Sequence, residues 1–135
     1  MSCESEYEVR PSLYYTENHT WAQVMPDGLV KVGVTDYAQK MLRTVTRVRL
    51  EMVDTDVEQF GSFGVIESIK AVSDLTSPLS GKIKETNDNV LRRPFIVNRD
   101  PYGAGWMMVL EPTNLEEELG RLLSAEKYQE MIRGA

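Results

Sequence analysis

The sequence is poor in the residues that build disulfide, zinc and histidine-dependent sites. Its 135 residues include one cysteine and one histidine, Cys3 and His19. A single cysteine excludes an internal disulfide, and zinc sites usually need several cysteine and histidine ligands. A catalytic pair of these two residues is disfavoured, because Cys3 belongs to a polar terminal segment of the kind that is usually loosely held. We expect a reducing, cytoplasmic compartment and a packed, structural His19 beside Trp21.

The sequence also lacks a basic excess, a long apolar run and a phosphate-binding loop. Its 15 basic and 21 acidic residues give a formal net charge of −6, which disfavours binding to nucleic acid or to an anionic membrane. No apolar run could span a bilayer, and the acidic first six residues resemble neither a secretory signal nor a transit peptide. The glycines match neither the dinucleotide nor the P-loop pattern. The length and the 41% hydrophobic content predict one small domain, residues 1–135.

Short alternating segments predict a mainly β fold, with the β core over residues 14–112. Residues 13–24 and 29–34 have the patterns of two strands. Pro26 and Gly28 lie between them and favour a turn, so these runs predict a hairpin.

A short helix is predicted after the second strand, where the apolar period changes. Thr35 or Asp36 can cap this helix, which would continue to Leu42. We expect it to serve packing alone. Its apolar face would consist of Tyr37, Ala38, Met41 and Leu42.

The tail, residues 113–135, has the pattern of two helices joined by a tight turn. Asn114 with Glu117 is a capping signature, and Ser124 can cap a second helix that continues to Met131. Their apolar faces would pack on the sheet rather than form a partner groove. The residues on these faces are Leu115, Leu119, Leu122, Leu123, Tyr128, Met131 and Ile132.

Residues 44–50 predict a half-exposed strand with a basic strip. Strict alternation places Arg47 and Arg49 on the same face as Val45. The strip has two interpretations. It is either a solvated strand face, which contributes little to stability, or a docking strip for an acidic partner.

Lys70 is the most informative candidate for function. An apolar run leads to it from Phe63, and a second run leads away from it to Pro78. Two strands with a short connection place Lys70 at or near the tip of a β-hairpin. No Gly or Asn lies between Ser68 and Val72, so the primed turns are disfavoured and a type I turn remains compatible. Pro78 indicates that its strand is an edge or ends there.

Three roles are open to this lysine: an ordinary solvated turn residue, a Schiff-base nucleophile, or an attachment point for a carried group. The nucleophile is disfavoured, because Glu67 and Asp74 are the closest charges in sequence and both favour the ammonium form. An exposed amine on a rigid hairpin suits a group that another enzyme attaches.

Five segments, in order, resemble the glycine cleavage system H protein family. Residues 97–106 are close to the family's N-x-D-P-Y-G-x-G-W pattern, and residues 15–21 resemble its H-x-W segment. The other three are residues 32–39, close to G-I-T-D-Y-A-Q, and residues 63–74 and 77–81, which resemble the lipoylation hairpin (63–81). The resemblance covers about residues 14–132. It implies the lipoyl and biotinyl carrier fold, a flattened barrel-sandwich hybrid with short helices at the C-terminus.

The resemblance implies a non-catalytic carrier with lipoate joined to Lys70 as an amide. In this family the lipoyl arm accepts an aminomethyl group during glycine decarboxylation by a pyridoxal-phosphate enzyme. An aminomethyltransferase passes the one-carbon unit to tetrahydrofolate, and a flavin-dependent dihydrolipoyl dehydrogenase reoxidises the arm. A lipoate-attaching enzyme is the remaining implied partner. Biotin carriers usually flank their lysine with methionines, whereas Ile69 and Ala71 flank Lys70 and favour lipoate.

Three departures from the family pattern leave the cargo open. Thr20 replaces the glutamate of the family's H-E-W segment, which implies a change where the loaded arm folds back. Residues 42–51 are basic where the family is usually acidic, and Arg92 and Arg93 add further positive charge. Two alternatives to glycine cleavage therefore stay open. One is an H-like carrier in lipoate relay or lipoate-dependent sulfur oxidation, and the other is an unmodified interaction module.

Overall fold

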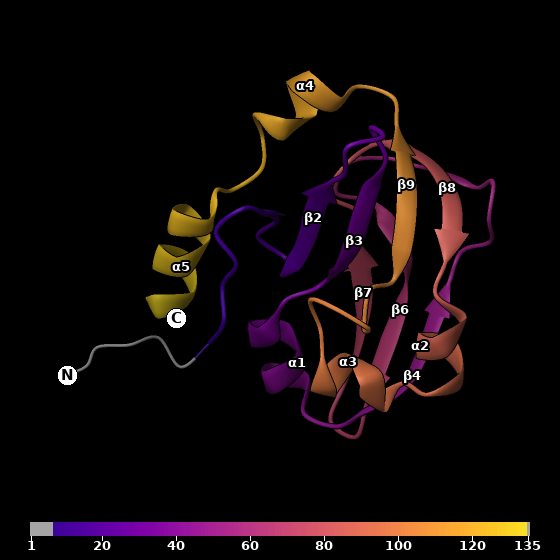
Figure 1. The fold of residues 1–135 in the computed structure, drawn as a ribbon. Coiled ribbons are helices and arrows are strands. Elements are labelled where there is room, and N and C mark those ends of the chain that lie inside the picture. Colours follow the sequence, from indigo (N-terminus) through magenta and orange to yellow (C-terminus); the bar gives the residue numbers. More distant parts are fainter. Residues whose placement is uncertain (1–6, 135) are drawn as a thin grey trace.

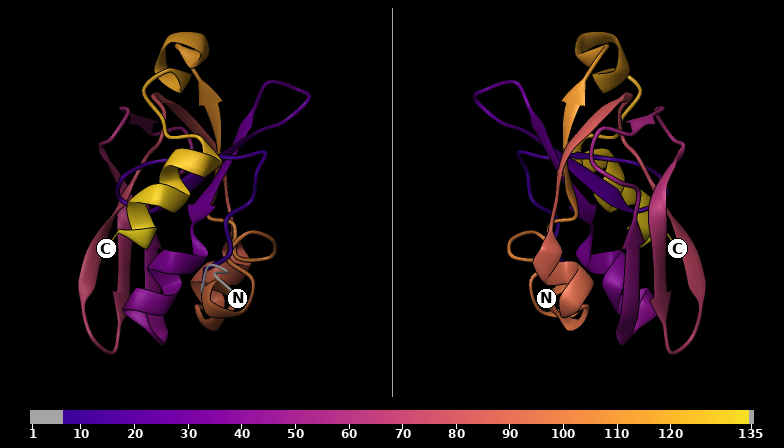
Figure 2. Two further views of the ribbon diagram at one scale, coloured as in Figure 1. Left: turned by 90° about the vertical axis from the view of Figure 1, so that its left-hand side faces the viewer. Right: turned by 90° about the vertical axis from the view of Figure 1, so that its right-hand side faces the viewer.

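A computed structural model describes residues 7–134, so Cys3 and its terminal segment lie outside the described residues. Two antiparallel sheets form the two layers of the molecule (Figures 1 and 2). The larger sheet has the strand order β1-β2-β3-β9-β8-β5, and the smaller one has the order β4-β6-β7. The predicted mainly β, two-sheet architecture is confirmed, and the sheets do not close into a barrel. No helix within residues 7–134 is long and apolar enough to cross a membrane.

The strands lie between residues 14 and 112. They are β1 (Tyr14–Tyr15), β2 (Thr20–Val24), β3 (Val30–Val34), β4 (Val45–Leu50), β5 (Asp56–Val57), β6 (Ser62–Ser68), β7 (Val72–Thr76), β8 (Gly81–Thr86) and β9 (Met108–Pro112). The helices are α1 (Asp36–Leu42), α2 (Asp88–Arg92), α3 (Phe95–Arg99), α4 (Leu115–Leu119) and α5 (Ala125–Arg133).

Alternate residues of both sheets meet in one buried core. In the β2–β3 hairpin, Val30, Val32 and Val34 are buried as their alternation predicts. They pack in the same cluster as Phe63 from β6 and Leu75 from β7, so the core fixes the hairpin β6–β7 against the larger sheet. This rigid attachment positions everything that lies at the tip of that hairpin.

The predicted face of the arginine strip was wrong because β4 contains a β-bulge. Val45 pairs with Ser68, whereas Arg47 already pairs with the next residue of β6, Glu67. The extra residue shifts the alternation by one, so Val45 and Val48 are both buried while Arg47 and Arg49 are exposed on the opposite face.

The helix α1 begins where the sequence predicts, with the Thr35 hydroxyl accepting from the Ala38 N–H at 3.1 Å. Its inward face is more polar than expected. Asp36 and Gln39 are buried. Met41 is predicted to lie on the apolar face of this helix, but it is exposed and does not join the core. A hydrogen bond of 2.8 Å from Gln39 to the Asp36 carboxylate makes this buried polar face possible.

The C-terminal helices form as predicted, but the turn after α4 is followed by an extended residue, so the connection is longer than the predicted tight turn. Ser124 caps α5, and the predicted inward residues Tyr128 and Ile132 are buried. Between α4 and α5, Leu123 is extended and exchanges backbone hydrogen bonds of 2.8 and 2.9 Å with Tyr15 of β1. This bridge separates the two helices, as Figure 1 shows.

Candidate functional site

Lys70 lies in the short connection between β6 and β7, as the sequence predicts. Glu67 pairs with Val72, and the three residues between Ser68 and Val72 project beyond the paired part of the strands. Lys70 is exposed, and the neighbouring Ile69 side chain is 70% exposed. The tip is therefore open to a second protein.

Ser68 holds the turn in one conformation. Its hydroxyl accepts from the backbone N–H groups of Lys70 and Ala71, both at 3.1 Å. Its own N–H donates to the Ala71 carbonyl at 2.8 Å. No residue from 68 to 72 has a positive φ, which confirms that the turn is not a primed one. The strand β7 is an edge strand and ends at Thr76, two residues before Pro78, as predicted.

Two contacts attach the tip to the last turn of α1 and to the segment that follows it. The Ile69 N–H donates to the Thr44 carbonyl at 3.2 Å. The Lys70 Nζ donates to the Met41 carbonyl at 3.1 Å. Carbonyls in the last turn of a helix lack helical partners and favour a cation, which explains why the amine lies there.

A cleft of about 160 Å³ lies between α1 and the hairpin, beside this contact. Met41 lines the cleft and also accepts the hydrogen bond from Lys70, so the cleft adjoins the position of the amine. The apolar residues that line it are Val34, Ala38, Met41, Leu42, Ile66 and Leu75. The polar residues are Asn18, His19, Thr20, Ser73 and Asp74. The cleft can thus hold an apolar chain that ends in a polar group.

His19 is a structural residue at the polar end of the cleft, as predicted. Its Nδ1 forms a hydrogen bond of 2.9 Å with the Tyr128 hydroxyl, and its ring packs 4.7 Å from the Tyr37 ring. Burial lowers the pKa of the imidazole, which therefore stays neutral near pH 7. Burial also raises the pKa of the Tyr128 hydroxyl, so this pair carries no charge.

Thr20 is buried and fully hydrogen-bonded. Its hydroxyl donates to the Thr76 carbonyl at 2.8 Å and contacts the Thr16 hydroxyl at 2.8 Å. It therefore connects β2 to the end of β7 and supplies no charge. Asp74 is the carboxylate among the described residues that line the cleft.

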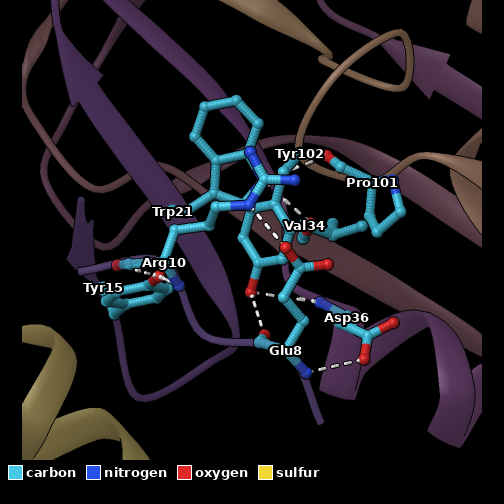
Figure 3. A network of polar contacts seen from close by, with 8 residues as sticks. All are labelled: Glu8, Arg10, Tyr15, Trp21, Val34, Asp36, Pro101 and Tyr102. Atoms are coloured by element: carbon cyan, nitrogen blue, oxygen red, sulfur yellow. Dashed lines mark hydrogen bonds and ion pairs between the residues drawn. The ribbon is translucent and has the colours of Figure 1, made fainter. Parts of the chain in front are cut away.

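The segments at residues 15–21, 32–39 and 97–106 meet away from Lys70, in the network of Figure 3. The Trp21 Nε1–H donates to the carbonyls of Val34 (2.9 Å) and Pro101 (3.1 Å). A Cβ on Gly33 would lie 2.6 Å from the Trp21 ring, so only glycine fits beneath it. In this network the motifs build the frame of the protein, while other residues of the same segments line the cleft beside Lys70: Asn18, His19, Thr20, Val34 and Ala38.

The same network ties the N-terminal segment to α1. The Tyr102 hydroxyl donates to the Glu8 carbonyl at 2.7 Å, and the Glu8 N–H donates to the Asp36 carboxylate at 2.9 Å (Figure 3). Burial alone would raise the pKa of Asp36, but hydrogen bonds from Glu8, Gln39 and Lys40 outweigh it and lower the pKa. Within residues 7–134, no three metal-ligating side chains of the His, Cys, Asp and Glu types cluster.

Comparisons with known proteins agree with this geometry. The family model described as glycine cleavage H-protein matches residues 13–135. The chain belongs to the glycine cleavage H-protein family. A probable glycine cleavage system H protein of Pyrococcus abyssi is 47% identical over 128 residues, which are 95% of each chain. A glycine cleavage system H protein of Carboxydothermus hydrogenoformans is 44% identical over 92% of this chain and 94% of its own.

The fold of this H-protein family member also has a solved counterpart. The crystal structure of a glycine cleavage system H protein from Mycobacterium marinum superposes with a TM-score of 0.84. It is 36% identical, and the match covers 94% of this chain and 100% of that one. The likeness extends over both sheets and the C-terminal helices, because it covers almost the whole chain.

Sequence reasoning found the tip of this H-protein but missed what surrounds it. The Met41 and Thr44 carbonyls hold the tip, and Asn98 ties the segment after α1 to α3. The contacts to these carbonyls could not be predicted, because every residue has a main-chain carbonyl whatever its side chain. The role of Asn98 depends on contacts across more than 50 residues, which no local pattern reveals.

Proposed function

We propose that this H-protein family member is the lipoyl carrier of the glycine cleavage system, with lipoate joined as an amide to Nζ of Lys70. The observation that carries the proposal is the exposure of this lysine at the tip of a fixed hairpin, beside a cleft that suits an apolar arm. One domain, residues 1–135, would carry one arm. The cytoplasmic location stays a prediction from the sequence.

The residues around Lys70 fit a lipoyl arm. An amide nitrogen retains one N–H, which suits the Met41 carbonyl that now accepts from Nζ. The apolar wall of the cleft suits the hydrocarbon part of the arm. Lipoate supplies a dithiolane that accepts and releases the aminomethyl group of glycine, so the side chains of the carrier need to perform no bond chemistry. They bind and orient the arm.

Asp74 gives the cleft a carboxylate for a cationic cargo. An amine attached near the polar end would remain protonated beside this carboxylate. Because Thr20 stands where the family usually has glutamate, Asp74 is the one acidic side chain among the described residues that line the cleft. This supports the aminomethyl cargo over a different group, and the relatives named above are likewise glycine cleavage proteins.

The proposal implies four enzymes as partners. They are a pyridoxal-phosphate glycine decarboxylase, an aminomethyltransferase, a dihydrolipoyl dehydrogenase and a lipoate-attaching enzyme. Each of them must reach the tip of the hairpin, because the carrier moves its cargo between their active sites.

The test is a reconstitution of glycine cleavage with Lys70→Arg. We expect glycine-dependent CO2 release to fall to the rate without the carrier, while thermal unfolding stays unchanged because the side chain is exposed. Lys127→Arg, on α5, is the matched control and should retain full activity. Equal activity of both variants would refute the proposal. Lipoylation without any response to glycine would instead indicate a carrier for another pathway.

A further inference from the structure

We propose that a basic groove beside the hairpin tip docks an acidic protein surface on the enzymes that use Lys70. The arginine groove is an open depression of about 550 Å³ between the end of α1 and α3. Arg43 lines it from the α1 side, Phe95 and Arg99 line it from α3, and Thr44 and Asn98 also contribute. The inference rests on the proposed function, since it takes Lys70 as the attachment point.

The groove adjoins the tip. Thr44 lines the groove, and its carbonyl accepts the hydrogen bond from the N–H of Ile69, the residue before Lys70. Figures 1 and 2 show α1, α3 and the β6–β7 connection at the same end of the molecule. An enzyme that encloses an arm on Lys70 therefore meets the groove as well.

The two arginines of the groove keep their positive charge without a carboxylate partner in the described part of the chain, whereas Lys40, which also lines the groove, pairs with Asp36 at 3.1 Å. Neither Arg43 nor Arg99 forms an ion pair with a carboxylate of residues 7–134, and the same holds for Arg47, Arg92 and Arg93 nearby in sequence. Several basic residues elsewhere do form such pairs. Those outside α1 are Arg10, Arg49, Lys82, Lys84 and Arg121. Carboxylates from a partner would thus find free guanidinium groups here, which favour bidentate contacts.

The proposed docking surface is therefore the arginine groove and not the strip of Arg47 and Arg49 that the sequence suggested. Arg49 is paired with Glu67 at 3.3 Å across the sheet, so the strip itself is partly neutralised. Arg47 remains, three residues after Thr44, and extends the basic surface along β4. Both α2 and α3 contact β4, so Arg92 and Arg93 belong to this end of the molecule as well.

Phe95 provides an apolar anchor in the groove. Its side chain is 45% exposed, and the Arg99 guanidinium lies 5.2 Å from the centre of its ring. Arginine and aromatic side chains dominate the binding energy of protein interfaces, whereas phosphate recognition alone needs no such anchor. The fitting partner surface therefore carries Asp and Glu around an apolar side chain.

Asn98 makes the groove rigid. Its amide group donates to Gln39 (2.9 Å) and to the Arg43 carbonyl (2.7 Å), and its oxygen accepts from the Val45 N–H (2.9 Å). These bonds join α3, the end of α1 and the start of β4. A preformed groove loses little conformational freedom on docking.

The net charge of the whole chain favours a compact acidic partner over a long polyanion. The helix α4, at the far end in Figure 1, has three successive glutamates, of which Glu117 pairs with Arg121 and Glu118 is buried against Ser80. With a net charge of −6, the chain repels nucleic acid as a whole.

The experiment compares two doubly charge-reversed, fully lipoylated proteins. Arg43→Glu with Arg99→Glu alters the groove, and Lys82→Glu with Lys127→Glu makes the same change in net charge on β8 and α5. We expect the KM of the glycine decarboxylase for the groove variant to rise about tenfold at low salt, with kcat within about twofold. The control should change less than about threefold, and added salt should reduce the difference. The neutral pair Arg43→Gln with Arg99→Gln should be intermediate, which excludes misfolding as the cause.

Equal KM values for the two charge-reversed proteins would overturn the proposal. Competition by a short RNA, with unchanged KM in the groove variant, would overturn it in favour of a nucleic-acid surface. Failure of the proposed function appears differently, as wild-type protein that the decarboxylase does not use. In that case the KM of the lipoate-attaching enzyme for the same variants tests the groove. A wild-type protein that is never lipoylated would overturn both.

Discussion

Lys70 and His19 differ in their access to solvent, and this difference fits the carrier role proposed for Lys70 and the structural role of His19. The Lys70 amine is exposed and makes one hydrogen bond, to the Met41 carbonyl. The only histidine of the chain is packed against Tyr37 and bonded to Tyr128. The exposed amine of Lys70 is accessible to an enzyme that would acylate it. The imidazole of His19 is held neutral and packs in the wall of the cleft.

The buried imidazole predicts a pH dependence of stability. Because folding lowers the pKa of His19, only the unfolded chain takes up its proton just below pH 6.5. The stabilisation is present above that pH and is lost as pH falls toward the pKa of the folded state. Urea unfolding of wild type and His19→Asn measures it. The difference in unfolding free energy should shrink by about 0.5–1 kcal/mol between about pH 7.5 and 5.5, allowing for the partial exposure of the ring.

Asparagine is the chosen replacement because His19 has a φ of 72°, a conformation that asparagine tolerates better than most residues. As His19 is the only histidine, no other imidazole contributes to the difference. A constant difference across this pH range would show that the folded imidazole titrates normally, contrary to the prediction.

At the scale of elements, the hairpin could be predicted and its surroundings could not. Two apolar runs separated by residues 69–71 suffice to place Lys70, because strand pairing follows from alternation and turn chemistry. The bulge at Val45 leaves no such signal, and a strict period of two therefore assigned the wrong face to the arginines. The helices α2 and α3 have five residues each, too few to show a helical period.

The cleft and the arginine groove were beyond prediction for a different reason. Each is formed by α1 together with elements that lie far along the chain, the hairpin for the cleft and α3 for the groove. Sequence alone shows that Arg43 and Arg99 are basic. Only the three-dimensional structure shows that they line the same depression, next to the hydrogen bonds of Asn98.

Asn98 is the residue through which these elements are joined, and its removal should be costly. We expect Asn98→Ala to lower the unfolding free energy by about 1–3 kcal/mol, because three hydrogen bonds are lost and the Val45 N–H is left without a partner. Asn89→Ala is the control. Its side chain makes no hydrogen bond with the described residues, and alanine suits a helix, so its change should stay within about 0.5 kcal/mol. Equal effects of both changes in urea unfolding would contradict the role given to Asn98.

At the scale of the whole molecule, the frame and the site are separated. The network around Trp21 and Tyr102 (Figure 3) stabilises the larger sheet and the N-terminal segment, while the smaller sheet carries the tip. Arg43 and Arg99, which have no carboxylate partner within residues 7–134, lie at the end that holds Lys70. A carrier that visits several enzymes needs this arrangement, because its exposed end must bind and release without disturbing the fold.

The most direct test of the central claim is the intact mass of the protein from its native cells, with peptide mapping across Lys70. The account predicts the mass increment of one lipoyl amide, confined to the peptide that contains Lys70. An unmodified Lys70, in cells whose other lipoyl proteins are modified, would contradict it.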